Sequence, residues 1–207
     1  MIYGRGDKMS FDYRATHSAD VFDSRVEFGG ISLYEPAGDE KHIRRTVRRI
    51  EDMKGFFSDE EALENEDAKR TVYWVDSFNP VEDGTQGGLL FGVTNIQPGS
   101  IGTECFMTKG HFHAVRDRGE FYWGISGRGL LLLMTEDGST RAERVRPSSL
   151  HYIPGHTAHR LVNCSHVTLS VGACWHADAG HEYGLIASHG FGLRVYAKES
   201  GVEVVPV

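Results

Sequence analysis

The chain has 207 residues, which is long enough for one domain with a substantial hydrophobic core. Its composition, 40% hydrophobic and 25% charged, is typical of a globular protein in water and argues against a disordered, collagen-like or membrane protein. The formal net charge is −7 and no long run of Lys or Arg occurs, which argues against nucleic acid as a partner. A small anionic substrate, held by a few local donors, remains compatible with this charge.

The cysteines and the N-terminus both bear on the compartment in which the protein works. Cys105, Cys164 and Cys174 are odd in number and form no C-x-x-C pair, which argues against a disulfide framework or a thiolate zinc site. The N-terminus lacks the apolar core of a signal peptide, and no apolar run reaches the roughly 20 residues of a membrane span. We therefore expect a cytoplasmic protein without a membrane partner.

Residues 1–40 mix charged, glycine and aromatic residues without a sustained period. We interpret them as an N-terminal arm of unknown role, with short strands expected at Val21–Phe22 and Ile31–Tyr34. Residues 41–207 are expected to form a single domain that begins with short helices.

An amphipathic helix is predicted over residues 41–53. Four apolar residues recur there at spacings of four, three and three: Ile43, Val47, Ile50 and Met53. The basic residues between them would then form the solvated face of this helix: His42, Arg44, Arg45, Arg48 and Arg49. Gly55 is expected to end it.

A second short helix is predicted to begin at Ser58. Ser58 and Glu61 have the spacing of a capping box, in which each side chain satisfies a free backbone amide at the start of a helix. The apolar pair Ala62 and Leu63 follows, and the polar stretch 65–70 ends the element.

From Thr71 onward the chain consists of short runs rich in β-branched and aromatic residues. These runs cover 71–78, 88–96, 101–108, 120–126, 129–135, 140–146, 150–154, 159–163 and 167–174. Gly127-Arg128-Gly129 and Glu136-Asp137-Gly138 mark turns between them, and Glu199-Ser200-Gly201 predicts a last hairpin. Strands at such short intervals, with no helical pattern between them, predict an all-β-dominated sandwich or barrel.

The stretch 110–129 carries the strongest indication of a metal site. His111 and His113 alternate on an expected strand, so both imidazoles should face the same side. Glu120 can add a carboxylate from the next strand, and His159 can arrive from a later strand beyond the turn at Pro154-Gly155. One H-x-H pair among 11 histidines is weak evidence alone, but this combination favours a divalent zinc, iron, manganese or nickel ion.

These motifs resemble the two signatures of the cupin superfamily, H-x-H…E…G and P…H-x-x-x-N. Two departures are visible: six residues separate His113 from Glu120, and His156 stands where a Gly is expected. Both departures resemble the cupin-type phosphoglucose isomerases, known from archaea and some bacteria. Residues 108–120, TKGHFHAVRDRGE, and residues 177–184, ADAGHEYG, are similar to characteristic segments of that family.

The resemblance covers about residues 41–205 and implies a cupin fold, a double-stranded β-helix or jelly-roll-like barrel. It implies metal-dependent interconversion of glucose 6-phosphate and fructose 6-phosphate, a reaction of glycolysis and gluconeogenesis, by a homodimer with one divalent ion per site. The implied metal ligands are His111, His113, Glu120 and His159. Glu120 is also our candidate for the catalytic base that moves the proton between C1 and C2, and a metal-assisted hydride shift is the competing route. The implied sugar-phosphate pocket contains Thr94, Thr108, Gly110, Tyr122, His181, Tyr183 and Tyr73.

Two alternative functions use the same scaffold. A metal-dependent cupin dioxygenase also employs three histidines and one glutamate, and a non-catalytic sugar-binding cupin keeps the barrel without chemistry. The segment 177–184 favours the isomerase over both. Lys109, Arg116 and Arg118 lie near the H-x-H pair and are further candidates for attracting phosphate.

Overall fold

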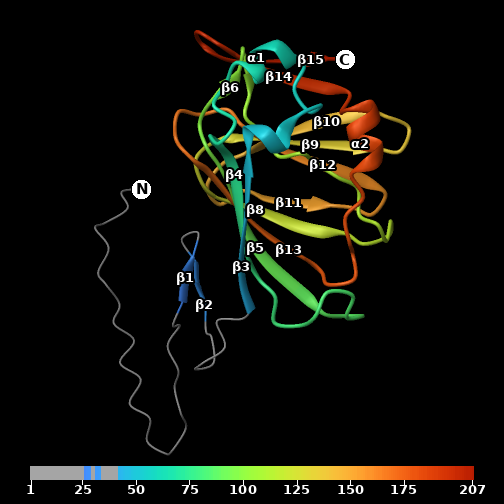
Figure 1. Ribbon diagram of the computed structural model, residues 1–207. Helices are drawn as coiled ribbons and strands as arrows, with labels where there is room; N and C mark the ends of the chain where they lie inside the picture. Colours follow the sequence, from blue (N-terminus) through green and yellow to red (C-terminus); the bar gives the residue numbers. More distant parts are fainter. Residues whose placement is uncertain (1–25, 29–30, 34–41) are drawn as a thin grey trace, which may run out of the picture.

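The structure is a computed structural model that describes residues 26–28, 31–33 and 42–207. Antiparallel strands dominate this part of the chain, as the sequence predicts, and they form a barrel closed by two packed groups of strands (Figure 1). The two short α-helices lie outside the strands, and the C-terminal hairpin sits beside α1 at one end of the barrel (Figure 1). The expected all-β-dominated fold with a few short helices is confirmed.

The larger sheet has six strands in the order β11-β8-β13-β5-β4-β3, and all neighbours are antiparallel. Its strands are β3 (Ile43–Arg49), β4 (Thr71–Phe78), β5 (Leu89–Ile96), β8 (Glu120–Ser126), β11 (Leu150–Ile153) and β13 (Leu169–His176). The register places Thr94 of β5 opposite Val75 of β4 on one side and Val171 of β13 on the other. The inner face of this sheet forms one wall of the cavity described below.

The facing wall contains a three-stranded sheet, β10 (Thr140–Val145), β9 (Gly129–Thr135) and β12 (Thr157–Asn163). A four-stranded sheet continues it, with β15 (Gly201–Pro206), β14 (Leu193–Lys198), β7 (Glu104–Cys105) and β6 (Ser100–Ile101). The predicted hairpin turns join β9 to β10 and β14 to β15. Isolated bridges at Met107 and His111 lay the segment after β7 along the free edge of β12.

The hydrophobic core lies between these sheets. Its largest fully buried side chains come from several strands and from the segments before them: Phe106, Met53, Ile96, Ile101, Leu131, Leu132, Leu133, Ile153, Leu161 and Leu169. Burying one such side chain contributes about 1.5–3 kcal/mol relative to leaving it exposed. Because β9 is covered on both faces, its run of leucines does not alternate with polar residues.

The prediction of a helix over residues 41–53 is wrong. Residues Ile43–Arg49 form β3, and only Ile50–Met53 turn into a 3-10 helix, η2. The free edge of β4 decides this, because pairing from Ile43 with Phe78 to Arg49 with Thr71 satisfies the backbone groups of the segment. Ile50 and Met53 are buried, as the amphipathic pattern required.

Helix α1 (Glu60–Glu64) confirms the second predicted helix, but its cap differs from the prediction. Asp59, not Ser58, is the N-cap residue, and its side chain accepts a hydrogen bond of 2.8 Å from the Ala62 amide. Ser58 instead binds the buried Glu104 carboxylate through its amide and its hydroxyl. Helix α2 (Gly184–His189) was not predicted from the sequence.

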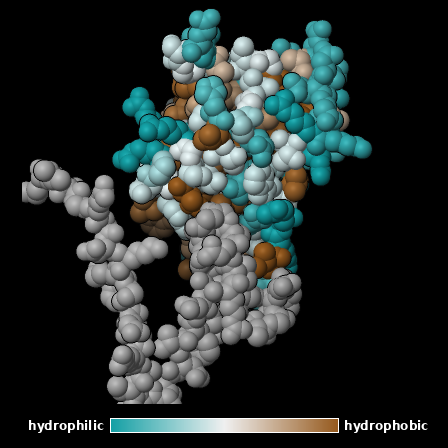
Figure 2. Space-filling view, turned by 90° about the vertical axis from the view of Figure 1, so that its left-hand side faces the viewer, coloured by the Kyte–Doolittle hydropathy of each residue, from teal (hydrophilic) through white to brown (hydrophobic). Residues whose placement is uncertain are grey.

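Strands β1 (Val26–Phe28) and β2 (Ile31–Leu33) pair as a hairpin. The strand predicted at Ile31–Tyr34 is confirmed over Ile31–Leu33, whereas Val21–Phe22 lies outside the described residues. No helix within the described part of the chain is long and apolar enough to cross a membrane. On the face shown in Figure 2, the hydrophobic residues lie in separate groups among hydrophilic ones.

Candidate metal and substrate site

Three histidines from two distant segments meet at one point inside the barrel. His111 and His159 exchange backbone hydrogen bonds of 3.3 and 3.1 Å, which brings their ring centroids to 4.4 Å. The His113 ring lies 5.3 Å from that of His159, and one nitrogen of each of the three rings is within 4.8 Å of the others. The segment carrying His111 and His113 forms isolated bridges instead of the regular strand that was predicted, yet both imidazoles converge.

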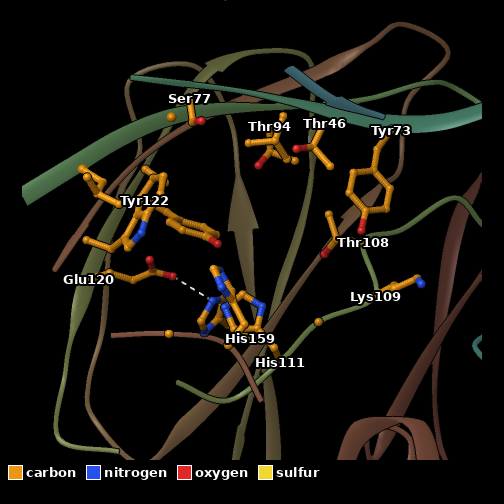
Figure 3. A pocket seen from close by; sticks show the side chains of 18 of the residues that line it. Thr46, Tyr73, Ser77, Thr94, Thr108, Lys109, His111, Glu120, Tyr122 and His159 are labelled. Carbon is orange, nitrogen blue, oxygen red and sulfur yellow. Dashed lines mark ion pairs between the residues drawn. The ribbon is translucent and has the colours of Figure 1, made fainter. Parts of the chain in front are cut away.

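Glu120, the first residue of β8, completes this cluster. Its Oε1 lies 2.7 Å from Nε2 of His159, and its Oε2 lies 3.7 Å from Nε2 of His113 (Figure 3). Although they are close, Oε1 and the His159 Nε2 are buried without an aligned hydrogen-bond partner in the described part of the chain. Three imidazoles and one carboxylate aimed at a shared point fit a divalent transition-metal ion.

The protonation states of the cluster also suit a metal. Burial by itself would raise the pKa of Glu120, but His159 and His113 outweigh it and hold that pKa far below its usual range. Burial, His159 and His181 lower the pKa of His111 well below 6.5, so this imidazole is neutral. Metal binding requires carboxylates that are ionised and imidazoles that are neutral. Burial opposes protonation of His113, but Glu120 raises its pKa, so a proton competes for this ring.

A second layer of contacts holds the histidines in place. Nδ1 of His113 donates to the Arg118 carbonyl at 2.7 Å, which leaves its Nε2 for the cluster. The Arg118 guanidinium makes two hydrogen bonds, of 2.9 and 2.8 Å, to Asp178. Phe112 and Glu182 exchange backbone hydrogen bonds of 3.1 and 2.8 Å. The segment 177–184 is therefore fixed to the H-x-H segment by its side chains and its backbone.

These contacts place His181 and Tyr183 at the cluster. The His181 ring lies 4.4 Å from that of His111, and the Tyr183 ring stacks on His181 at 5.9 Å with an interplanar angle of 8°. Burial lowers the pKa of His181 and raises that of Tyr183, so both are neutral near pH 7. Both side chains can form hydrogen bonds with an uncharged part of a ligand.

A cavity of about 440 Å³ opens from the cluster toward the inner face of the large sheet (Figure 3). Every residue of the predicted pocket lines it: Tyr73, Thr94, Thr108, Gly110, Tyr122, His181 and Tyr183. Of the four predicted ligands, His111, Glu120 and His159 line the cavity, whereas His113 does not. A volume of this size suits a small polar metabolite.

Tyr122 lies next to Glu120 on the inward face of β8. Its side chain is buried, and burial together with the nearby Glu120 carboxylate raises its pKa well above 10. The hydroxyl therefore stays protonated and can donate to the carboxylate. Tyr122 can thus orient the Glu120 carboxylate without acting as a base itself.

The cavity also has lining residues that were not predicted from the sequence, notably three from β3: Arg44, Thr46 and Arg48. The helical interpretation had placed the two arginines on a solvated surface. A period of two was visible in the same sequence, because these residues alternate with Arg45, Val47 and Arg49. Lys109 lines the cavity, whereas Arg116 and Arg118 do not.

Comparison with known proteins assigns the family. The family model "Glucose-6-phosphate isomerase (GPI)" matches residues 47–206. The glucose-6-phosphate isomerase of Thermococcus litoralis is 39% identical over 178 residues, covering 85% of this chain and 92% of that protein. That of Pyrococcus horikoshii is 40% identical over 180 residues, covering 85% and 93%. The putative glucose-6-phosphate isomerase 1 of Rhizobium meliloti is 36% identical over 181 residues, covering 82% and 83%.

Among solved structures, a mutant oxalate decarboxylase of Bacillus subtilis matches with a TM-score of 0.42 and 19% identity, over 58% of this chain and 30% of that one. The family model and the relatives, by contrast, extend over most of this chain and include the segments that form the histidine cluster. The chain therefore belongs to the cupin-type glucose-6-phosphate isomerase family.

Proposed function

We propose that this protein is a metal-dependent isomerase that interconverts glucose 6-phosphate and fructose 6-phosphate. The observation that carries the proposal is the buried cluster of three histidines and Glu120 at one end of a cavity, in a chain of this family. The cavity continues from that cluster to a wall of hydroxyl groups, so one ligand can reach both.

We propose His111, His113 and His159 as three ligands of one divalent ion and Glu120 as the fourth. The Nε2···Oε contacts of Glu120 with two of these histidines support its inclusion. A divalent ion bound there would act as a Lewis acid toward the carbonyl and the neighbouring hydroxyl of the sugar. Iron, zinc, manganese and nickel all match this donor set.

Glu120 is also the proposed base. Its carboxylate, kept ionised by His159 and His113, would take the proton from C2 of the aldose and return it to C1. A second proton passes from O2 to O1, so that the aldose becomes the ketose with no net loss of atoms. The Tyr122 hydroxyl holds the carboxylate in one orientation during the transfer.

The rest of the pocket would orient the substrate. We place the phosphate near Thr94, Thr108 and Gly110, and the sugar hydroxyls near His181 and Tyr183. Gly110 has a φ of +72°, and a Cβ there would lie 2.6 Å from the Phe191 ring, so the backbone approaches its neighbours closely. Binding of the distant phosphate supplies orientation at the reacting carbons.

The function is tested by a coupled assay with fructose 6-phosphate, run with and without a chelator and beside an oxygen electrode. We expect metal-dependent glucose 6-phosphate formation with no oxygen consumption. Oxygen uptake would instead indicate a cupin dioxygenase. Sugar-phosphate binding without turnover in the metal-loaded protein would indicate a non-catalytic cupin.

Glu120→Gln and His159→Ala are expected to lower turnover by orders of magnitude. Glu120→Gln keeps the shape of the side chain but removes the base and the anionic ligand, and His159→Ala removes an imidazole from the cluster. Turnover and metal content are to be measured together, with Glu199→Gln in the exposed C-terminal turn as the control. Near-wild-type turnover and metal content in either site variant would disprove the ligand assignment.

The proton-transfer route makes a separate prediction about isotopes. If Glu120 shuttles the proton, turnover in deuterated water should place deuterium at C2 of glucose 6-phosphate, because a carboxylic acid exchanges its proton with solvent. Mass spectrometry of the product measures this. Complete retention of the substrate hydrogen would favour a hydride shift between C1 and C2.

We also propose that the protein acts in the cytoplasm as a homodimer. Exposed hydrophobic side chains on the outer face of the large sheet support an association between two copies.

A further inference from the structure

The cavity has two chemically different ends. Glu120, His111 and His159 form the metal end, whereas Figure 3 shows Thr46, Tyr73, Thr94 and Thr108 on the other side of the cavity. We call these four residues the hydroxyl end. A ligand that spans the cavity can therefore place hydrogen-bond acceptors at this end, where each hydroxyl offers one donor.

Arg48 of β3 lies beside the hydroxyl end. The register of β3 and β4 sets it directly opposite Tyr73, and its side chain is half-buried and lines the cavity. Burial raises the pKa of the Tyr73 hydroxyl, whereas the Lys109 amide and the Arg48 guanidinium near it act to lower that pKa. Burial has the larger effect, so Tyr73 stays protonated near pH 7 and its hydroxyl can donate into the cavity that it lines.

Thr108 can donate into the cavity as well. Its hydroxyl oxygen accepts a hydrogen bond of 3.1 Å from the Leu161 amide, so its own proton is available. Thr94 is buried in the middle of the sheet, with its side chain on the cavity wall. Several donors thus converge without an acceptor to match them, which suits a ligand group that carries several acceptor oxygens.

The positive charge at this end is only partly compensated. Among residues 42–207, Arg45, Arg118 and Arg194 each pair closely with a carboxylate, and Arg44 approaches Asp83 at 3.8 Å. No carboxylate in that range forms an ion pair with Arg48. Lys109 adds a second cation. Desolvation and then the charge of Arg48 lower the pKa of its ammonium group, and the charge of Asp52 offsets part of this effect. Two neighbouring cations would be stabilised by an anion between or beside them.

We propose that Arg48 binds the phosphate group of the substrate and thereby makes β3 the element that selects phosphorylated over unphosphorylated sugars. A planar guanidinium can donate two parallel hydrogen bonds to phosphate oxygens, which a lysine ammonium cannot. The neighbouring side chains of the hydroxyl end hold the remaining oxygens. This inference rests on the proposed function for the identity of the sugar, but not for the binding of phosphate.

The test uses the metal-loaded full chain and inorganic phosphate as the probe. Arg48→Gln should weaken calorimetric binding of phosphate and raise KM for fructose 6-phosphate by about 10- to 100-fold, the range of a charge-assisted hydrogen bond. Metal content should not change. Arg48→Lys should recover part of the loss, because it restores charge but not the paired donors.

Arg49→Gln is the matched control, since Arg49 is the next residue, is exposed and does not line the cavity. It should keep wild-type phosphate binding and KM. Unchanged phosphate binding in folded Arg48→Gln, or an equal loss in Arg49→Gln, would overturn the assignment of Arg48. Failure of the proposed function would look different: the wild type would turn over neither sugar phosphate, while the calorimetric comparison would still decide the role of Arg48.

Discussion

At the scale of single residues, burial has opposite effects on two kinds of acid in the cavity. Glu120 is buried yet ionised, because His159 and His113 more than compensate the cost of desolvation. Tyr73 and Tyr122 are buried and protonated, because nothing around them stabilises a phenolate enough. The cavity therefore offers one carboxylate as a base and several hydroxyls as donors at the same pH.

Tyr73 gives a prediction about stability at alkaline pH. Burial raises its pKa to about 12 in the folded protein, against about 10 in an unfolded chain. The unfolded state loses this proton first, so the stability contributed by Tyr73 is complete below pH 10 and is lost as pH rises to 12. The full loss is about 3 kcal/mol.

Urea unfolding between pH 9 and 12 measures this effect. Tyr73→Phe has no proton to lose, so its free energy of unfolding should fall less steeply than that of the wild type over this range. Parallel curves for the two proteins would show that Tyr73 does not titrate differently in the folded and unfolded states.

At the scale of elements, the short segment 177–184 acts as a cover for the metal end. It has little secondary structure of its own before α2 and is held by backbone pairing with Phe112 and by the Arg118–Asp178 ion pair. The same Arg118 accepts the His113 hydrogen bond through its carbonyl. One residue therefore links a metal ligand to the segment that carries His181 and Tyr183.

Arg118→Gln is expected to lower kcat/KM by roughly 10-fold, as loss of supporting contacts around a metal site commonly does. The backbone carbonyl that orients His113 remains, so the metal should stay bound. Measurement of kcat/KM beside metal content tests this, with the exposed Arg144→Gln as the control. Loss of metal in parallel with activity would contradict the prediction that the Arg118 side chain is not needed to hold the metal.

Edge strand β3 shows where prediction of an element from sequence fails. Ile43, Val47, Ile50 and Met53 have the spacing of a helix, and no local feature forbids one. The competing pattern, period two from Arg44 to Arg48, becomes favourable only because β4 offers a free edge. A partner that lies more than 20 residues later in the chain cannot be read from the segment itself.

At the scale of the whole molecule, the outer face of the large sheet carries large hydrophobic side chains that are exposed in a single chain. Leu150, Tyr152, Phe121 and Leu89 are 67, 56, 47 and 52% exposed. Leu150, Tyr152 and Phe121 lie on the neighbouring strands β11 and β8, where Phe121 packs against Tyr152 and the register sets Leu150 opposite Trp123. Exposed hydrophobic surfaces of this kind commonly mark protein interfaces.

We therefore expect sedimentation to give twice the 23.0 kDa mass of one chain. Tyr152→Asp should shift the protein toward the monomer, because a charge would have to be desolvated in the interface. Val202→Asp in the C-terminal hairpin, also at an exposed hydrophobic residue, should not. A wild type that sediments as a monomer at all concentrations would contradict the homodimer.

The sequence by itself determined the strands after Thr71 and the candidate ligands, because alternation, turn residues and motif spacing are local properties of the chain. It did not determine where Arg44, Thr46 and Arg48 lie, nor that Asp178 pairs with Arg118. The tertiary structure decided both, since each depends on which distant segment supplies the partner for a backbone edge or a charge. The convergence of His111 and His159 has the same origin, a backbone bridge between segments almost fifty residues apart.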